Sequence, residues 1–339
     1  MKIITFGEIM LRLNPPEYRR IQQAESFEVH YGGSEANVAA FLAQVGFDAY
    51  FVTKVPDNAL GEACIWHLRK FGVKTDWVVL GGERLGIYFL EVGASQRPSK
   101  VVYDRAHSAI SQAHEDDFPW KVIFEGARWF HFSGITPALG GNLPKIVGKA
   151  LKIAKEKGLI VSCDLNYRAK LWSAEEAQKV MIPFMKYVDV LIANEEDIVK
   201  VLGMKVEGLD LKTGEINREG YVAVAEEMAR RFGFKVIGIT LRESLSASVN
   251  MWSALVYEQG QAYFSKRYKV HIVDRVGAGD SFAGGLIYAC LKDLSPQEKV
   301  EFAVAASCLK HTIPGDFAVL NEEEVAKLAG GVTSGRVER

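Results

Sequence analysis

The chain has 339 residues, of which 24% are charged and 48% are hydrophobic, and its formal net charge is −1. This balance gives no bulk field that would attract nucleic acid or anionic membranes, so we expect neither as a partner. No stretch approaches the roughly 18 apolar residues that span a bilayer, and residues 1–20 lack the pattern of a signal peptide. The four cysteines lie far apart without metal-ligand spacing, which indicates reduced thiols and a cytoplasmic protein.

Short apolar runs alternate with helix-like segments along most of the chain. The alternation is typical of an α/β protein with a doubly wound, mainly parallel sheet flanked by helices. Ser34 is expected to cap the first helix. The expected strands are 2–9, 48–55, 129–134, 159–166, 188–194 and 234–241, and the expected helices are 34–46, 60–72, 143–158, 221–233 and one that begins near residue 280.

Two regions interrupt this rhythm, because residues 10–33 and 78–106 are β-rich and have no helices between their strands. We predict that they form a small antiparallel sheet, a lid over the open edge of the main sheet. The lid and the main sheet are predicted to form one domain over residues 1–330. Residues 331–339 are predicted to be a polar tail.

The lid strands carry apolar residues at alternating positions, among them Ile87, Phe89 and Val101. This pattern predicts an apolar outer face that a second copy of the chain would cover. We therefore expect a homo-oligomer joined through the lid.

A glycine-rich turn, VDRVGAGDSFAGG at residues 273–285, precedes an apolar, helix-compatible segment. A helix N-terminus offers unpaired N–H groups and partial positive charge, so this turn is suited to bind a phosphate. The chain has no P-loop pattern, and Phe282 stands where a dinucleotide fingerprint needs a third glycine. The alternative is a turn that only packs a helix, with Asp280 as its cap. If Asp280 lies in the first helical turn, the helix dipole should hold it ionised and weakly basic.

A second glycine turn, YGGSEAN at residues 31–37, opens the first helix. Gly33 would let a ligand lie against the backbone, and Asn37 would bond its hydroxyl groups. The alternative is an ordinary turn and cap.

Together these motifs resemble those of the ribokinase-like (PfkB) carbohydrate kinases. That family has Gly-Gly-x-x-x-Asn near its N-terminus, here residues 32–37, and Gly-Ala-Gly-Asp near its C-terminus, here residues 277–280. The resemblance covers essentially the whole chain and implies a kinase that uses Mg-ATP. It implies that Asp280 contacts the substrate and is the catalytic base, and that the N–H groups of Gly277, Ala278 and Gly279 stabilise the transferred phosphoryl group.

Within this family, the segment Asp164-x-Asn166-x-Arg168 and the pair Tyr103 and Arg105 resemble the kinases of 2-keto-3-deoxygluconate. The resemblance implies ATP-dependent phosphorylation of the terminal (6-) hydroxyl of this sugar acid. Arg105 and Arg168 would bind its carboxylate, with Tyr103 and Tyr88 beside them. The alternative is that Arg168 contacts ATP phosphates and Arg105 makes a surface salt bridge.

The nucleotide side departs from the family pattern, since the turn expected at residues 241–244 contains no glycine. Arg242 is expected to replace a backbone donor there. Asp274 is expected to take part in a monovalent-cation site, and Glu195 and Asp197 to hold Mg²⁺ through water. The expected nucleotide-binding residues are Asn194, Thr240, Arg242, Gly277, Gly279 and Asp316.

Two other functions remain open at this point. A ribokinase- or fructokinase-type enzyme would act on a neutral sugar, which gives the two arginines no carboxylate partner. A sugar-acid or nucleotide sensor would keep the fold without catalysis, for which the irregular 241–244 segment is the motivation. The motifs do not resolve the gluco epimer from the galacto epimer.

Overall fold

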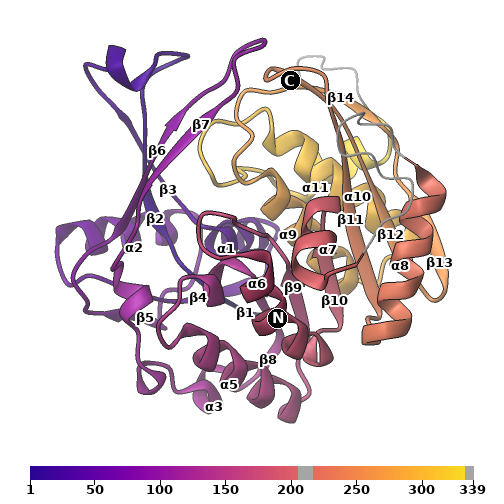
Figure 1. Cartoon of the computed structure of the whole chain (residues 1–339), viewed down its shortest axis with the longest axis horizontal. Helices are drawn as coiled ribbons and strands as arrows, with labels where there is room; N and C mark the ends of the chain where they lie inside the picture. The colour runs from indigo at the N-terminus through magenta and orange to yellow at the C-terminus, as the bar shows by residue number, and fades with distance from the viewer. Residues whose placement is uncertain (205–216, 333–339) are drawn as a thin grey trace.

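The computed structural model describes residues 1–204 and 217–332; most of the predicted tail, residues 333–339, lies outside the described residues. Within the described residues the larger sheet has ten strands, in the order β13-β12-β11-β10-β9-β8-β1-β4-β5, with β14 paired to β12 (Figure 1). The strands from β11 to β5 run parallel, whereas β12 is antiparallel to β11. Its strands are β1 (Lys2–Phe6), β4 (Asp48–Val55), β5 (Val78–Leu80), β8 (Ala127–Ser133), β9 (Ile160–Asp164), β10 (Val190–Ala193), β11 (Val236–Ser244), β12 (Val249–Glu258), β13 (Gln261–Phe264) and β14 (Tyr268–His271).

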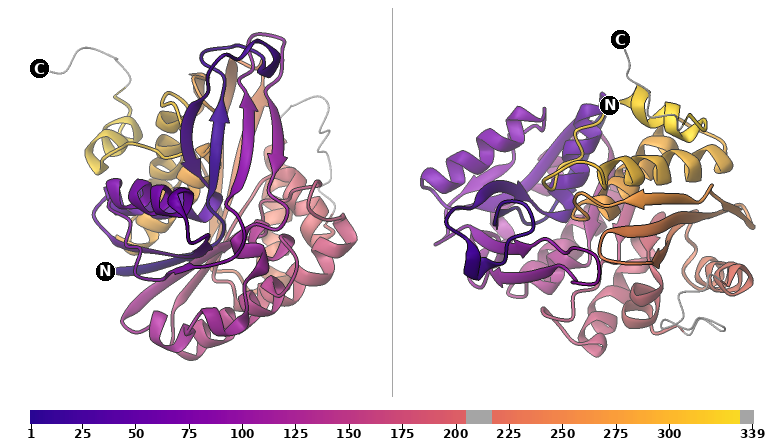
Figure 2. Two further views of the ribbon diagram at one scale, coloured as in Figure 1. Left: turned by 90° about the vertical axis from the view of Figure 1, so that its left-hand side faces the viewer. Right: turned by 90° about the horizontal axis from the view of Figure 1, so that it is seen from above.

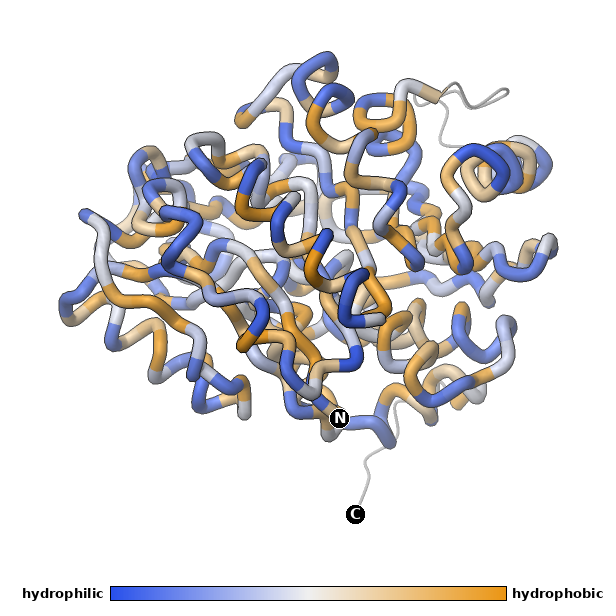
Figure 3. The backbone as a smooth tube through the Cα atoms, turned by 90° about the horizontal axis from the view of Figure 1, so that it is seen from below, coloured by the Kyte–Doolittle hydropathy of each residue, from blue (hydrophilic) through white to orange (hydrophobic). Residues whose placement is uncertain are grey.

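Two buried cores lie on opposite faces of this sheet, because alternate strand residues point to opposite sides. Ile4 belongs to one core and Ile3 to the other. Apolar positions are concentrated along the interior strands, while the surrounding helices alternate apolar and hydrophilic positions (Figure 3). The first core is covered by α3 (Trp120–Ile123), α4 (Ile135–Ala138), α5 (Leu143–Glu156), α6 (Ala174–Met181), α7 (Glu195–Leu202) and α8 (Arg218–Phe232), and the second by α1 (Ser34–Gln44), α2 (Ala59–Lys70), α9 (Ala278–Leu291), α10 (Pro296–Lys310) and α11 (Glu322–Ala329).

A separate four-stranded sheet stands away from the larger one and forms the lid (Figure 2). Its strands are, in spatial order, β3 (Glu28–Gly32), β2 (Met10–Asn14), β6 (Gly86–Glu91) and β7 (Lys100–Asp104). The expectation of an antiparallel lid was wrong in one pairing, since β2 runs parallel to β6. The expected start of the second lid region was also wrong, because residues 78–80 form β5 and pair with β4 in the larger sheet.

One predicted lid residue lies on the other face. Val101 pairs with Leu90 and packs with it on the inner face, so it does not belong to the outer face with Ile87 and Phe89. Val102, the register partner of Phe89, takes that place and is exposed. The side chains of β7 do alternate between the two faces of the lid, but the prediction assigned them to the opposite faces, an error of one residue.

In the described part of the chain, no helix is both long enough and apolar enough to cross a membrane. The four cysteines are free thiols, as expected.

Close packing between α9 and α10 depends on Gly285. A Cβ atom built on Gly285 would lie 2.9 Å from the Cα atom of Ala303 on α10. Gly285→Ala should therefore lower the free energy of unfolding by about 1–3 kcal/mol through overpacking, measured by thermal or urea denaturation. Gly148→Ala is the matched control, because the nearest atom there is the movable ring edge of Phe184 at 3.3 Å. Equal stability of Gly285→Ala and the unmodified protein would contradict this account.

Candidate active site

A cavity of about 420 Å³ lies at the carboxyl ends of the parallel strands, beneath the inner face of the lid. The cavity brings together residues that are far apart in the chain. Among the predicted site residues it is lined by Gly33, Asn37, Tyr88, Tyr103, Arg105, Arg168, Asn194, Glu195, Thr240, Arg242, Gly277, Ala278, Gly279, Asp280 and Asp316. Asp197 and Asp274 are predicted residues that do not line it.

Asp280 is the third residue of α9 and is held by the beginning of α1. Ser34 Oγ donates to Asp280 Oδ1 at 2.7 Å, and Asn37 Nδ2 donates to Asp280 Oδ2 at 2.6 Å. Asn166 Nδ2 in turn donates to Ser34 Oγ at 3.0 Å. Ser34 was expected to cap α1, but Gly33 is the N-cap and the hydroxyl of Ser34 serves Asp280 instead. The N-termini of α1 and α9 therefore converge on one carboxylate.

The electrostatic environment of Asp280 differs from the expectation of a weakly basic carboxylate. Burial raises the pKa of Asp280 above its ordinary value, and the hydrogen bonds from Asn37 and Ser34 and the charge of Arg168 only partly oppose this. Desolvation of the charged form outweighs the helix dipole. Asp280 is therefore a better proton acceptor than its place in a helix suggested.

The turn before α9 presents backbone to open space. Gly277 has φ +83°, and a Cβ there would lie 2.1 Å from the carbonyl oxygen of Asp316, so this position needs glycine. A Cβ on Gly279 would meet no atom within 4 Å. An anion can thus approach the first turn of α9 from the cavity.

The two predicted carboxylate-binding arginines have different surroundings. Arg105 is buried, forms an ion pair with Glu8, and lies over the ring of Tyr103 at 5.2 Å. Arg168 is exposed, and its charge lowers the pKa of Asp280. Much of the charge of Arg105 is therefore neutralised within the protein, whereas that of Arg168 is directed at the cavity.

The structure alters the roles predicted for Asn194 and Asp197. Asn194 is the N-cap of α7, and both oxygens of Asp197 accept backbone N–H groups, from Tyr167 at 2.8 Å and Asn194 at 3.2 Å. Because its carboxylate is used in this way and stays outside the cavity, Asp197 does not suit the expected metal role. Within the described residues, no group of three or more His, Cys, Asp or Glu can hold a metal ion.

The segment at residues 241–244 was expected to be an irregular turn, but it is strand. β11 continues to Ser244 and pairs with β12 throughout. Arg242 therefore projects from a strand, and its charge contributes to lowering the pKa of its neighbour Arg275, after burial, which is the larger cause. Both arginines line the cavity. Two like charges side by side suit a polyanion such as a nucleotide phosphate chain.

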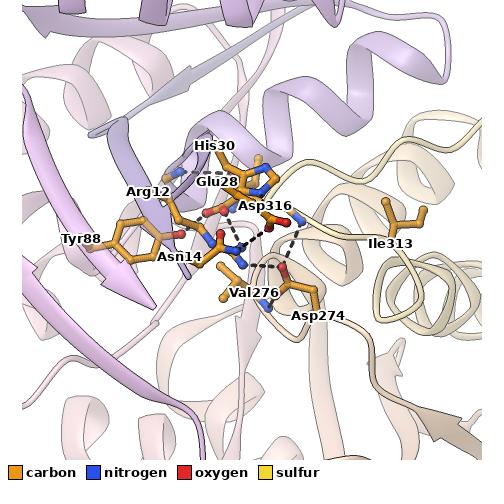
Figure 4. A network of polar contacts seen from close by, with 12 residues as sticks. Arg12, Asn14, Glu28, His30, Tyr88, Asp274, Val276, Ile313 and Asp316 are labelled. Carbon is orange, nitrogen blue, oxygen red and sulfur yellow. Dashed lines mark hydrogen bonds and ion pairs between the residues drawn. The ribbon is translucent and has the colours of Figure 1, made fainter. Parts of the chain in front are cut away.

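The expected cation site at Asp274 and the expected nucleotide contact at Asp316 are both altered by a residue that sequence reasoning missed. Arg12, on β2 of the lid, donates to Asp274 Oδ2 at 2.6 Å and to Asp316 Oδ1 at 2.9 Å (Figure 4). Tyr88 donates to the other oxygen of Asp316 at 2.5 Å. The guanidinium of Arg12 thus lies where a monovalent cation was expected, and the carboxylate of Asp316 accepts hydrogen bonds from two lid residues.

Comparison with known proteins identifies the family of the chain. The model of one family, described as pfkB family carbohydrate kinase, matches residues 1–322. The chain belongs to this family. The chain is similar to 2-dehydro-3-deoxygluconokinase from Thermotoga maritima, whose crystal structure has 69% sequence identity and a TM-score of 0.95, with 98% of this chain and 100% of that chain covered.

Two further proteins extend the comparison for this pfkB kinase. The 2-dehydro-3-deoxygalactonokinase of Haloferax volcanii is 34% identical over 334 residues, which is 98% of each chain. A structure from E. coli that carries the name ribokinase II, solved with ATP and Mg²⁺, shares the fold at 18% identity and a TM-score of 0.79, with coverage of 97% and 99%.

Other site residues of the pfkB kinase also escaped sequence reasoning. Glu35, within the Gly-Gly motif, is fully buried and accepts hydrogen bonds from Ser133 and Thr136, which joins α1 to the end of β8 and to α4. Burial raises its pKa. No local pattern distinguishes such a glutamate from an exposed first-turn acid, because its partners lie about 100 residues away.

The raised pKa of Asp280 predicts the acid limb of the pH–rate profile. A base must be deprotonated, so kcat/KM should fall as pH decreases through a pKa above the ordinary value of aspartate, near 3.9. Asp280→Asn should reduce kcat by roughly 10²- to 10⁴-fold and leave sugar affinity within a few-fold. Arg168→Gln should move the acid limb to higher pH. Retained turnover in Asp280→Asn would rule out the base role.

Proposed function

We propose that this protein phosphorylates 2-keto-3-deoxy-D-gluconate at its 6-hydroxyl, using ATP and releasing ADP. The observation that carries the proposal is one cavity that is lined both by a buried carboxylate at a helix N-terminus and by arginines at positions 105, 168, 242 and 275. The name of the Thermotoga maritima relative supports this sugar acid. The Haloferax volcanii relative is named for the galacto epimer, so both epimers belong in the assay.

The proposed reaction uses Asp280 as the proton acceptor. The substrate hydroxyl oxygen forms a bond to the γ-phosphorus of ATP, the bond from that phosphorus to the β,γ-bridging oxygen breaks, and the hydroxyl proton passes to Asp280. Charge on the transferred group is stabilised by N–H groups of residues 277–279 and by the dipole of α9. Phosphoryl transfer depends on this positioning and charge neutralisation more than on covalent chemistry by the protein.

The nucleotide is proposed to lie along the arginine side of the cavity. Arg242 and Arg275 would contact its phosphates, beside Asn194 and Thr240. Mg²⁺ usually keeps several waters and is held by substrate phosphates with one or two carboxylates. Glu195 lines the cavity and offers such a carboxylate, whereas Asp197 does not. When bound, the ion would supply further neutralisation of phosphate charge.

The substrate carboxylate is proposed to bind Arg168, with a smaller contribution from Arg105. Arg105 is already paired with Glu8, and its buried Nε has no hydrogen-bond partner among the described residues, so less of its charge is available to a ligand than that of Arg168. Tyr103 is stacked against Arg105, so the ring helps to orient that guanidinium. A neutral sugar would leave Arg168 without a matching charge.

The lid is proposed to exclude water during transfer. Its β6–β7 hairpin reaches the turn between β11 and β12, where Ala247 N donates to Ser95 O at 2.7 Å and Ser95 N donates to Ser248 Oγ at 2.9 Å. Exclusion of water strengthens electrostatic interactions within the site and limits hydrolysis of ATP.

The alternative of a non-catalytic sensor was motivated by an irregular segment at residues 241–244, and this segment is regular strand. Cytoplasmic location stays a prediction.

ADP release tests the substrate proposal directly. We expect turnover with 2-keto-3-deoxygluconate, and little or none with ribose, fructose or adenosine; the galacto epimer is included in the same panel. Arg168→Ala should raise KM for the acid sugar by roughly 10-fold or more, as expected for a lost charge-assisted contact. Turnover with only a neutral sugar would overturn the substrate, and equal weakening of acid and neutral sugars would overturn the role of Arg168.

We also propose that two or more copies associate through the outer face of the lid. Val29, Leu13, Phe89 and Val102 form one row across its four strands, and Val29 and Val102 are 57% and 52% exposed. A second copy that covers this row would remove apolar surface from water.

Light scattering at micromolar protein should show an oligomer. The double variant Val29→Lys/Val102→Lys should be a folded monomer, because charge on the row opposes its burial. Val122→Lys is the matched control, since Val122 is 48% exposed on α3, outside the lid. A monomeric unmodified protein would contradict the proposal.

A further inference from the structure

A buried charge cluster lies beside the phosphate-binding turn, outside the residues that line the cavity except for Asp316 and Tyr88. Its centre is Arg12, which is 1% exposed and bridges Asp274 and Asp316 (Figure 4). Burial by itself lowers the pKa of Arg12, but the two carboxylates outweigh it and the net pKa is raised, so the guanidinium stays charged. Two buried carboxylates that share one cation form a built cation site, occupied by the protein itself.

The two carboxylates belong to loops that enclose Gly277 from both sides. Asp274 Oδ1 accepts from Val276 N at 3.0 Å, which shapes the approach to α9, and Asp274 Oδ2 accepts from Gly315 N at 3.0 Å. The carbonyl of Asp316 lies against Gly277 so closely that a Cβ would be 2.1 Å from it. By joining Asp274 to Asp316, Arg12 therefore fixes the backbone that presents the anion-binding N–H groups.

The same cluster connects this turn to the lid. Arg12 lies on β2 and is the register partner of Tyr88 on β6, so both side chains leave the same face of the lid. Both donate to Asp316. Lys310 is fully buried beside Gly277, and its Cε would lie 3.3 Å from a Cβ atom built on Gly277. Its ammonium group donates a hydrogen bond to Ile313 O at 3.0 Å. The lid and the turn are thus joined through Asp274 and Asp316.

We propose that Arg12 is a positioning residue for phosphoryl transfer: its guanidinium is an internal cation that replaces a monovalent ion between Asp274 and Asp316 and holds the turn at residues 274–279 in register with the lid. The enzyme therefore needs no added K⁺ or NH₄⁺. This inference rests on the proposed kinase function. Arg12 touches neither the sugar nor the nucleotide, and it acts through Asp274 and Asp316.

The first test uses the unmodified protein. The rate of ADP release should differ by less than about two-fold among KCl, NaCl and tetramethylammonium chloride. Equal ionic strength keeps the screening by the three salts the same. Tetramethylammonium is the reference, because it is too large to enter a site built for one cation. Activation of the unmodified protein by K⁺, saturable and well above two-fold, would overturn the proposal.

The second test removes the internal cation. In tetramethylammonium buffer Arg12→Ala should lose about 10²-fold or more in kcat, the scale expected when a catalytic backbone shifts by about 1 Å or loses a donor. K⁺ or guanidinium should then restore at least ten-fold of this loss, with saturation. A variant that only loosens the lid would not respond to a specific cation. The double variant Arg12→Ala/Asp274→Asn should lose the rescue, because half of the carboxylate site is gone.

Controls separate this outcome from misfolding and from failure of the proposed function. Arg84→Ala removes a half-buried arginine that precedes β6 and pairs with Asp104 of β7 at 2.6 Å, and it should keep both kcat and salt independence. Arg12→Lys keeps a cation at this position and should therefore keep more activity than Arg12→Ala. As a readout that needs no substrate, K⁺ should raise the melting temperature of Arg12→Ala, relative to tetramethylammonium, and leave that of the unmodified protein unchanged.

The outcomes are distinct. No turnover of the unmodified protein with any sugar would count against the kinase function, while the melting-temperature shift would still report on the cation site. Two results would overturn the role of Arg12. One is full activity of folded Arg12→Ala in tetramethylammonium. The other is a loss of activity that neither K⁺ nor guanidinium reverses, together with no shift in melting temperature.

Discussion

Two hydrogen bonds, from Ser34 and Asn37 to Asp280, determine where the reactive carboxylate lies. They join the first turns of α1 and α9, so the two glycine turns that precede these helices must open onto the same space. The larger sheet makes this possible because its parallel strands end at one edge and return through helices on both faces. The cavity, the arginines around it and the inner face of the lid are all arranged about that meeting point.

The site keeps its negative charges buried, and this has a cost in stability. Burial, followed by the nearby charges of Asp197 and Asp280, raises the pKa of Asp164 well above its ordinary value, and burial raises that of Asp197 to about 6. A carboxylate with a raised folded-state pKa stabilises the fold at low pH and loses this contribution as pH rises through that pKa. As pH rises through these pKa values the carboxylates become charged against their mutual repulsion, and the positive charge of Arg168 offsets part of this cost.

Sequence patterns predicted the interior of the fold better than its contacts. The apolar run expected as a strand at residues 188–194 contains β10, whose four residues are all buried, because a buried parallel strand needs apolar residues on both faces. The glycine motifs likewise located Gly277 and Asp280. The continuation of β11 to Ser244 was missed, since it depends on pairing with β12 rather than on local composition. The partnership of Arg12 with Asp274 spans 262 residues, and no spacing in the chain indicates it.

The distance in sequence between the parts of the site also bears on how the protein matures. Ser34 and Asn37 are 246 and 243 residues from Asp280, and Arg12 is 304 residues from Asp316. A ribosome that has made the sugar-binding turn must still add most of the polypeptide before the carboxylate that completes it emerges. Contacts of such separation form late and slow the folding of a domain. A nascent chain of this kinase consequently has no means of consuming ATP until its synthesis is nearly finished.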